Sequence, residues 1–215
     1  MANSSNSAST SLRAVSANTC CDVTNHPLRT GGHSLRIMPS NWSRLISSPC
    51  PRSDSRLFLV LAHDRRRILH FNVTAHPTAE WTGQQLREAF PFAQLPRYLL
   101  RDRDTIFGAD FREQVRDMGI CEVLSAARSR WQRAYIERVI GSIRHECLDH
   151  VIVLHESALR RTLKSYFEYY HRSRTHLSLG KDSPEPRAIQ SPEMGSVVAM
   201  PQVGGLHHRY ERRAA

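Results

Sequence analysis

Apolar residues recur in a regular pattern only from about residue 56 onward. Two short apolar runs, LFLVLAHD and RRRILHFNVT, are separated by an arginine-rich turn, and this arrangement is typical of a β-hairpin. Thr78 stands where it can cap the next helix, which must end before Pro91. The alternation of strands and helices predicts an α/β layered sheet. We expect strands at 57–64, 65–74, 97–101 and 120–124, and helices at 79–90 and near 109–118.

Two longer helices are predicted in the second half of the chain. From about Trp131 the apolar residues repeat at intervals of three and four, which gives a helix one buried stripe. A second helix near 156–172 carries leucines and aromatic residues at the same period. Both stripes are interpreted as faces that pack in the core. The first stripe consists of Ile136, Val139, Ile140, Ile143 and Cys147.

The two ends of the chain differ in character from its centre. Residues 1–55 are rich in Ser, Asn and Thr and show no sustained period of either 3.6 or 2, so we expect a disordered or unrelated segment. Prolines interrupt regular structure from Pro184 onward, and residues 191–215 are expected to form a basic, mobile tail. The expected core therefore spans residues 56–190.

Composition bounds the class of partner. The chain has 215 residues and a formal net charge of +10, so it attracts anions, of which nucleic acid is the commonest polymer. Of its 30 basic residues only Lys164 and Lys181 are lysines; the arginines suit bidentate phosphate contacts, although a GC-rich genome gives the same bias. No run is long and apolar enough to span a membrane. We expect a soluble, cytoplasmic protein associated with the nucleoid.

Five cysteines, an odd number without framework spacing, indicate a reduced, intracellular protein. A zinc site could be imagined in the N-terminal segment. Adjacent cysteines do not easily bind one tetrahedral ion, however, and there is no second CxxC pair, so we do not expect zinc. The residues of that alternative are Cys20, Cys21, His26 and His33.

Two acidic residues stand where a side chain would project from a predicted element. Asp102 follows the strand at 97–101, and sites in α/β sheets collect at the carboxyl ends of strands. Glu137 lies on the predicted helix but outside its apolar stripe, so it can reach the sheet. Two such carboxylates could bind a hard cation such as Mg²⁺. Taken alone, a charged residue after a strand and a Glu on a helix are usually solvated surface groups or salt-bridge partners.

The letters around these residues resemble the catalytic core of retroviral-type integrases and bacterial insertion-sequence transposases. In that family the second Asp is followed five residues later by an aromatic residue, as Phe107 follows Asp102, and then by a helix that opens with Phe, here Phe111. The family Glu comes about 35 residues after it within a sequence like NxYxExxxGxxRxE, which ARSRWQRAYIERVIGSIRHECLDH matches with Glu137. Asp104 is the competing choice, but its spacing fits less well. The resemblance covers about residues 57–190 and includes YYHRSRTHLSLGKDSPEP (169–186).

The resemblance implies an RNase H-like mixed sheet flanked by helices and three carboxylates, Asp, Asp and Glu, that bind Mg²⁺ or Mn²⁺. The first Asp belongs on a strand before the hairpin, near residues 43–50, where the sequence is SRLISSPC. No acidic residue occurs between Asp22 and Asp54, and Asp54 lies too close to the hairpin. We therefore expect a core that lacks a normal first strand. A shifted reading frame over residues 1 to about 55 is our hypothesis for this break.

The implied activity is DNA cutting and strand transfer by metal-assisted phosphoryl transfer, with transposon ends and a target duplex as partners and a homo-oligomer as the active form. Without the first carboxylate we expect little or no activity. Arg130 and Arg133 also depart from the family, which has Pro and Asn there. The alternatives are a non-catalytic DNA-binding remnant and an unstable fragment. The expected DNA contacts are Arg101, Arg103, Arg133, Arg138 and Arg144.

Overall fold

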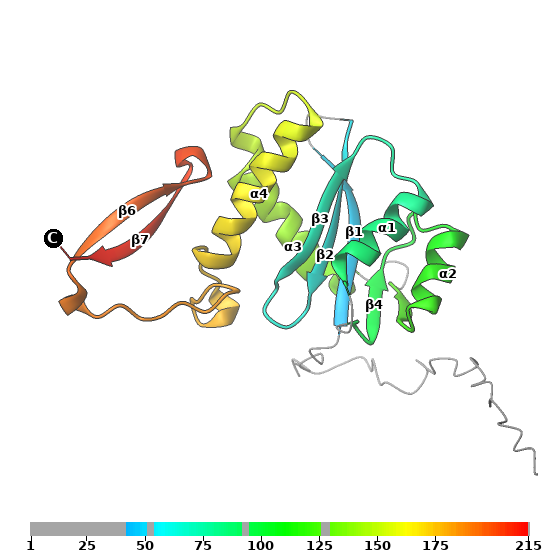
Figure 1. Cartoon of the computed structure of the whole chain (residues 1–215), viewed down its shortest axis with the longest axis horizontal. Helices are drawn as coiled ribbons and strands as arrows, with labels where there is room; N and C mark the ends of the chain where they lie inside the picture. The colour runs from blue at the N-terminus through cyan, green and yellow to red at the C-terminus, as the bar shows by residue number, and fades with distance from the viewer. Residues whose placement is uncertain (1–41, 51–53, 92–94, 126–129, 215) are drawn as a thin grey trace, which may run out of the picture. The chain divides into compact units, whose positions relative to one another are not determined.

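The computed structural model describes residues 42–50, 54–91, 95–125 and 130–214. These residues form a five-stranded sheet with two helices on each face, followed by a separate β-hairpin (Figure 1). No helix in these ranges is long and apolar enough to cross a bilayer. The strands are β1 (Trp42–Pro49), β2 (Arg56–Ala62), β3 (Ile68–Thr74), β4 (Tyr98–Arg101), β5 (Cys121–Leu124), β6 (Ser196–Gln202) and β7 (His207–Arg213), and the helices are α1 (Ala79–Ala89), α2 (Ala109–Asp117), α3 (Arg130–Glu146) and α4 (Glu156–Arg172).

The strand order in the main sheet is β3-β2-β1-β4-β5. β1, β2 and β3 are antiparallel, whereas β1, β4 and β5 are parallel. The expected mixed α/β sheet is therefore confirmed. The hairpin of β2 and β3 and all four helices are confirmed as well. The Thr78 cap of α1 is also confirmed, because the Thr78 side chain accepts a hydrogen bond from the Trp81 amide at 3.1 Å.

Two apolar clusters hold the helices against the sheet, one on each face. β2 contributes to both, because successive side chains of a strand point to opposite faces. Leu57, Leu59 and Leu61 pack with α3 and α4 on one face. Phe58 and Val60 pack on the other face, against the side of the sheet that α1 and α2 cover. The buried α3 stripe is confirmed for Ile136, Val139, Ile143 and Cys147, while Ile140 is partly buried.

The first strand, which the sequence was expected to lack, is present. β1 lies at the centre of the sheet, hydrogen-bonded to β2 on one side and β4 on the other. Ser43, Leu45 and Ser47 are buried on it, so serines occupy positions where apolar residues are usual. The expectation was wrong because pairing with two apolar neighbours forms a strand that local propensity disfavours. The sheet thus includes residues 42–49 of the segment expected to be disordered.

The C-terminal segment is also more ordered than expected. β6 and β7 pair antiparallel around a turn with positive φ at Val203, Gly204 and Gly205. Val203 is buried in the α3–α4 cluster, which anchors the hairpin. The mobile tail is therefore corrected to an anchored hairpin. The sequence did not predict these two strands, because both faces of the hairpin are largely polar or exposed and so show no apolar–polar alternation.

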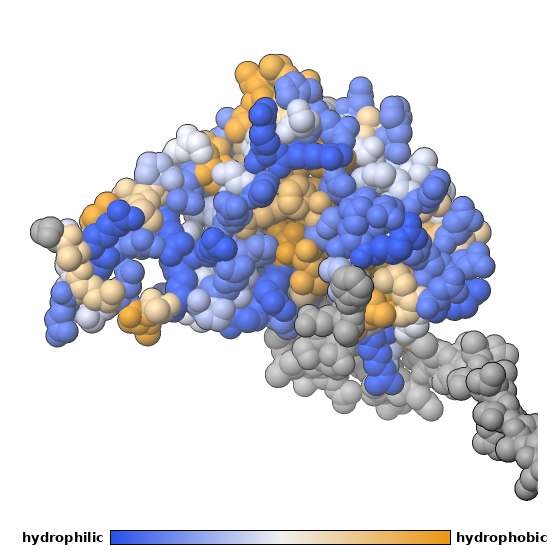
Figure 2. Space-filling view, in the orientation of Figure 1, coloured by the Kyte–Doolittle hydropathy of each residue, from blue (hydrophilic) through white to orange (hydrophobic). Residues whose placement is uncertain are grey.

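Most of the surface in one view is hydrophilic, with an apolar patch at the connection between α3 and α4 (Figure 2). Ile152 and Leu154 of this connection are more than four-fifths exposed. Cys50 and Cys147 are buried and form no disulfide, and burial together with the nearby Cys50 raises the pKa of Cys147 to about 11.

Candidate active site

Asp102 is the residue that directly follows β4. Leu99 and Leu100 before it are buried, so the strand is fixed in the sheet up to the point where the chain leaves it. Asp102 is half-buried, and its Oδ1 accepts a hydrogen bond from the Asp104 amide at 3.2 Å. This local turn presents the carboxylate at the carboxyl end of the strand, as the sequence predicted.

Asp104, the competing candidate, is held elsewhere. Its Oδ2 accepts a hydrogen bond from the Arg56 guanidinium at 2.5 Å, and its Oδ1 accepts one from the Ile106 amide at 3.3 Å. Arg56 is the first residue of β2, so this ion pair ties the loop after β4 to the start of the hairpin. Asp104 therefore has a structural role, and Asp102 remains the better candidate for chemistry.

Arg101 does not lie on the surface as its expected DNA contact requires. Its side chain is 5% exposed and donates to the Glu122 carboxylate of β5 and to the Asp102 carbonyl. Its guanidinium also lies over the Phe107 ring. A phosphate could bind Arg101 only if these contacts were broken. The expectation is corrected: Arg101 fixes the end of β4 and thereby positions Asp102.

Glu137 is exposed in the first half of α3, beside the buried Ile136. Its neighbour Arg138 is exposed as well. Arg103 is exposed, and its Nε lies 3.4 Å from the Ser125 carbonyl oxygen. Arg144 is 59% exposed and lies 3.7 Å from Asp149. The Arg133 side chain is outside the described residues.

No acidic residue of the described chain fills the place of the first carboxylate. β1 contains none, Asp54 is exposed before β2, and Asp64 lies in the β2–β3 turn beside Arg67. Across the described ranges, no group of three His, Cys, Asp or Glu side chains is placed to hold a metal ion. The zinc alternative at Cys20, Cys21, His26 and His33 falls outside these ranges.

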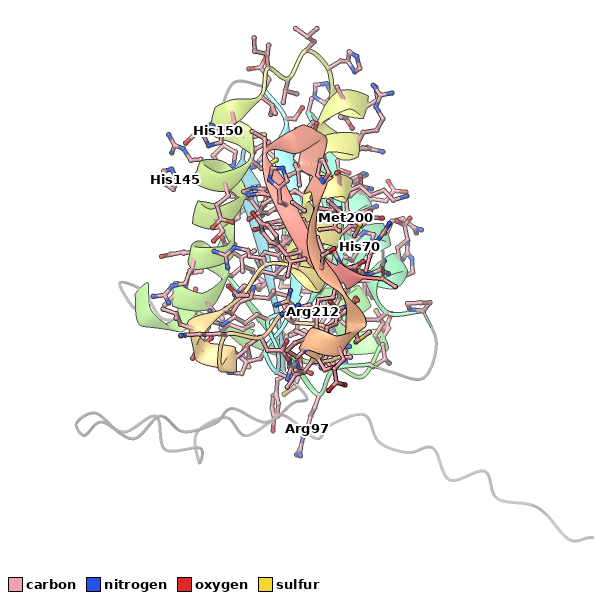
Figure 3. All side chains as sticks on the ribbon, turned by 90° about the vertical axis from the view of Figure 1, so that its left-hand side faces the viewer. His70, Arg97, His145, His150, Met200 and Arg212 are labelled. Carbon is pink, nitrogen blue, oxygen red and sulfur yellow. The ribbon has the colours of Figure 1, made fainter. Side chains whose placement is uncertain are left out.

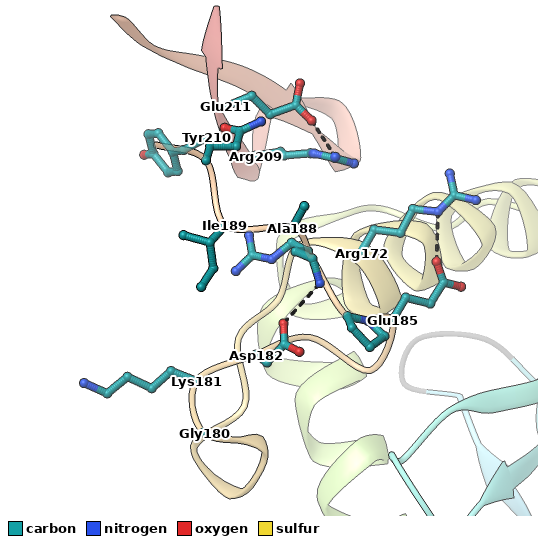
Figure 4. A pocket seen from close by; sticks show the side chains of 13 residues that line it. Arg172, Gly180, Lys181, Asp182, Glu185, Ala188, Ile189, Arg209, Tyr210 and Glu211 are labelled. Carbon is teal, nitrogen blue, oxygen red and sulfur yellow. Dashed lines mark hydrogen bonds and ion pairs between the residues drawn. The ribbon is translucent and has the colours of Figure 1, made fainter. Parts of the chain in front are cut away.

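Two other clusters of polar residues lie outside this region, and neither forms a ligand site. His145 and His150 lie together at the C-terminal end of α3 (Figure 3), but one ring contacts Asp149 at 3.1 Å and the other contacts the His145 carbonyl at 2.9 Å, so both are used locally. A hollow of about 730 Å³ lies between β7 and the chain after α4 (Figure 4). Its acidic residues are each paired with an arginine, which leaves no ligand set for a cation; the pairs are Asp182–Arg65, Glu185–Arg172 and Glu211–Arg209.

A polar network around Glu146, which the sequence did not predict, lies at the end of α3. Glu146, at the end of α3, accepts two hydrogen bonds from the Arg174 guanidinium, at 2.7 and 2.5 Å, and one from the Tyr166 hydroxyl at 2.8 Å. Burial raises its pKa, but the bonds from Arg174 and Tyr166 outweigh burial, so the pKa of Glu146 is lowered. His207 of the hairpin contacts the Glu146 carbonyl at 2.7 Å and stacks on Tyr169.

This network joins α3, α4 and the C-terminal hairpin, and it therefore holds the helix that carries Glu137. Arg174 belongs to the segment YYHRSRTHLSLGKDSPEP (169–186), which is part of the family resemblance. The resemblance of that segment to the family was the only hint in the sequence that Arg174 is important. The sequence did not show which carboxylate would pair with Arg174.

Comparison with known proteins agrees with this architecture. Residues 118–184, which include Glu137, match the family model described as Integrase core domain. A comparison with curated proteins found no match.

Several solved structures resemble the chain at low sequence identity. The catalytic core domain of BIV integrase is 12% identical with a TM-score of 0.54, over 68% of this chain and 91% of that one. The HTLV-2 integrase catalytic core domain, solved in complex with magnesium in a trimeric form, is 13% identical with a TM-score of 0.51, over 69% and 95%. A simian T-cell lymphotropic virus intasome, in complex with PP2A regulatory subunit B56 gamma, is 12% identical with a TM-score of 0.52, over 80% and 66%.

At these identities the structural likeness establishes the fold. The family match adds a sequence signature that runs from β5 through α3 and α4 to the first part of the chain after α4. Residues 118–184 thus carry the pattern of an integrase core domain, and the chain has the RNase H-like fold of integrase catalytic cores.

Proposed function

We propose that this chain is a polynucleotidyl transferase core of the integrase and transposase class, which cuts and joins DNA, and that its activity is impaired. One observation carries the proposal. Asp102 and Glu137 are spaced as in this family, they lie at the end of β4 and on α3 of an RNase H-like sheet, and Glu137 falls within the matched residues 118–184. In this reading both carboxylates are ligands for Mg²⁺ or Mn²⁺.

The residues present fit one hard cation but not a pair. Carboxylate oxygens are the donors that Mg²⁺ and Mn²⁺ prefer. When two ions are bound about 3.5–4 Å apart, they activate the attacking oxygen and stabilise the leaving one. A shared ligand is needed for such a pair, and among the described residues no group of three His, Cys, Asp or Glu side chains is placed to hold a metal ion. We derive no two-ion step for this chain, and we expect little or no strand transfer.

The other residues of the site have separate tasks in this proposal. Arg101, through its pair with Glu122, holds the end of β4 so that the Asp102 carboxylate is oriented before any ligand arrives. Arg103 and Arg138 are exposed neighbours of Asp102 and Glu137 in the sequence, and we propose that they contact DNA phosphates. We propose DNA ends and a target duplex as partners, a homo-oligomer as the active form, and the nucleoid of the cytoplasm as the location.

Incubation of the whole chain with labelled duplex ends and Mg²⁺ or Mn²⁺ tests the proposal. Asp102→Asn and Glu137→Gln remove one candidate ligand each, and Glu113→Gln on the exposed face of α2 is the matched control. Weak metal-dependent nicking that both site variants abolish and the control retains supports the assignment. Nicking that survives either site variant refutes it, and efficient strand transfer by the unchanged chain refutes the impairment.

A second candidate function is DNA binding without cutting. The exposed arginines favour it, as does the lack of a three-residue acidic group among the described residues. Binding through phosphates alone would tolerate any sequence and would weaken steeply with salt. Fluorescence anisotropy at several salt concentrations measures this. Salt-sensitive binding with no nicking in either metal supports the second candidate.

A further inference from the structure

The strand register identifies the position on β1 that lies beside Asp102. Leu45 pairs with Arg101 in the parallel ladder between β1 and β4, so the residues that follow, Ile46 and Asp102, are neighbours across the same two strands. On its other side Ile46 pairs with Leu59, which is buried on the face covered by α3 and α4. Paired residues share a face, so position 46 lies on the face of the sheet that α3 and α4 cover.

Alternation places Asp102 on that face too. Leu99 packs on the opposite face, and Arg101 lies there over Phe107, so the residue after Arg101 turns toward α3. Neighbouring strands lie about 4.8 Å apart. A carboxylate at position 46 would therefore stand next to Asp102 and beneath the helix that carries Glu137. Position 46 holds isoleucine, which cannot bind a cation.

The genetic code limits what a neighbouring reading frame of β1 can encode. In the frame that joins the last base of each codon to the first two bases of the next, every isoleucine codon contributes A and T. The displaced codon that ends within the Ile46 codon therefore encodes Tyr, His, Asn or Asp. It encodes Asp when the Leu45 codon ends in G, as the commonest leucine codon of GC-rich genes does. The arginine bias of this chain fits such a gene.

If the codons of Ser47 and Ser48 are of the TCN type, the codons that follow encode a better strand in this frame than in the one that is read. With serine codons of the TCN type, the displaced codons at Ser47 and Ser48 encode large apolar residues. The codon at Pro49 then gives Ser, Pro, Thr or Ala, and the codon at Cys50 gives Leu, Met or Val. An acidic residue followed by apolar ones suits a central strand covered on both faces, whereas the serines of β1 do not.

We propose that the chain up to about residue 55 is read one base out of register with its core, and that the displaced frame encodes an aspartate at position 46. The inference rests on the proposed function for the role of that aspartate. It explains together the serine-rich β1, the break in composition before Arg56 and the lack of any acidic residue between Asp22 and Asp54.

The coding DNA tests the reading frame directly. We expect the Leu45 codon to end in G, the codons of Ser47 and Ser48 to be of the TCN type, and the displaced frame to contain no stop codon from position 46 to position 53. Any other third base in the Leu45 codon, or a stop codon in that window, overturns the proposal.

Metal binding tests the position. In the whole chain, Ile46→Asp is expected to bind Mn²⁺ at least about tenfold more tightly than the unchanged chain, by titration calorimetry. Ile46→Asn has nearly the same shape without the charge, and Ser48→Asp places the charge on the same face two residues further along β1. Both controls are expected to bind as the unchanged chain does.

If Ile46→Asp unfolds, the same titration is made on a chain whose residues 46–53 are replaced by the displaced-frame sequence. A folded variant that binds Mn²⁺ no more tightly than the two controls overturns the assignment of position 46. Neither the DNA sequence nor the Mn²⁺ titration depends on whether the chain cuts DNA. A chain that binds Mn²⁺ at position 46 but never cuts DNA would therefore count against the proposed function alone.

Discussion

Replacing Arg174 with methionine removes the cation that holds Glu146 at the junction of α3, α4 and the hairpin. The guanidinium makes two hydrogen bonds to the carboxylate, and both side chains are largely covered, with 22% and 29% exposed. Loss of one partner of a fully buried pair costs about 3–5 kcal/mol, because a charge is left buried without its partner. Partial exposure and the remaining bond from Tyr166 reduce that cost. We expect a loss of about 2–3 kcal/mol in the free energy of unfolding.

Thermal unfolding measures this effect. For a chain of this size the loss corresponds to a fall in Tm of roughly 5–10 °C. Arg172→Met is the matched control, since Arg172 lies two residues away and its pair with Glu185 is 62% and 51% exposed. An exposed pair is worth only about 0–1 kcal/mol. Equal falls in Tm for the two variants would refute the reasoning.

The same variant has a signature in acid. The pKa of Glu146 is lowered in the folded chain, so its contribution to stability is present above the ordinary value of 4.5 and is lost as the pH falls through the lowered value. In Arg174→Met burial is no longer outweighed to the same extent, so the pKa of Glu146 rises. The difference in stability between the chain and the variant should therefore shrink as the pH falls through and below the ordinary value of 4.5. A difference that stays constant from neutral pH into acid would contradict this account.

Three further outcomes follow from the structure. Burial and the nearby guanidinium of Arg174 lower the pKa of His176 to about 4, so stability should fall as the pH drops from about 6.5 toward 4, and His176→Gln should flatten that fall in urea unfolding at each pH. Arg101→Met should cost about 3 kcal/mol of stability, because it leaves Glu122 without its partner. Arg138→Gln should leave Tm unchanged and weaken DNA binding. If Arg101→Met instead weakened DNA binding without lowering Tm, Arg101 would again be the better candidate for a DNA contact. His207→Ala should release the hairpin, seen as faster proteolysis within 196–213 at an almost unchanged core Tm, and unchanged cleavage would show that Val203 alone anchors it.

Local pattern determined much of this protein. The period of apolar residues placed α3 and α4, the Thr78 cap placed α1, and an arginine turn between two apolar runs placed β2 and β3. These features depend on contacts between residues close in sequence, and such contacts can be recognised from composition and spacing. The candidate pair Asp102 and Glu137 came from spacing and family resemblance, and the structure places both on the expected elements.

Tertiary structure alone decided the remaining features. β1 has few strand-forming residues, and it is a strand because β2 and β4 supply hydrogen-bond partners on both sides. The sequence predicts Arg101 as a surface cation, whereas in the structure it is buried and pairs with Glu122 of the neighbouring strand. Glu146 and Arg174 are 28 residues apart, and only the packing of α3 against α4 brings them together. Each of these outcomes depends on a partner distant in sequence, whose position no local pattern of residues can specify.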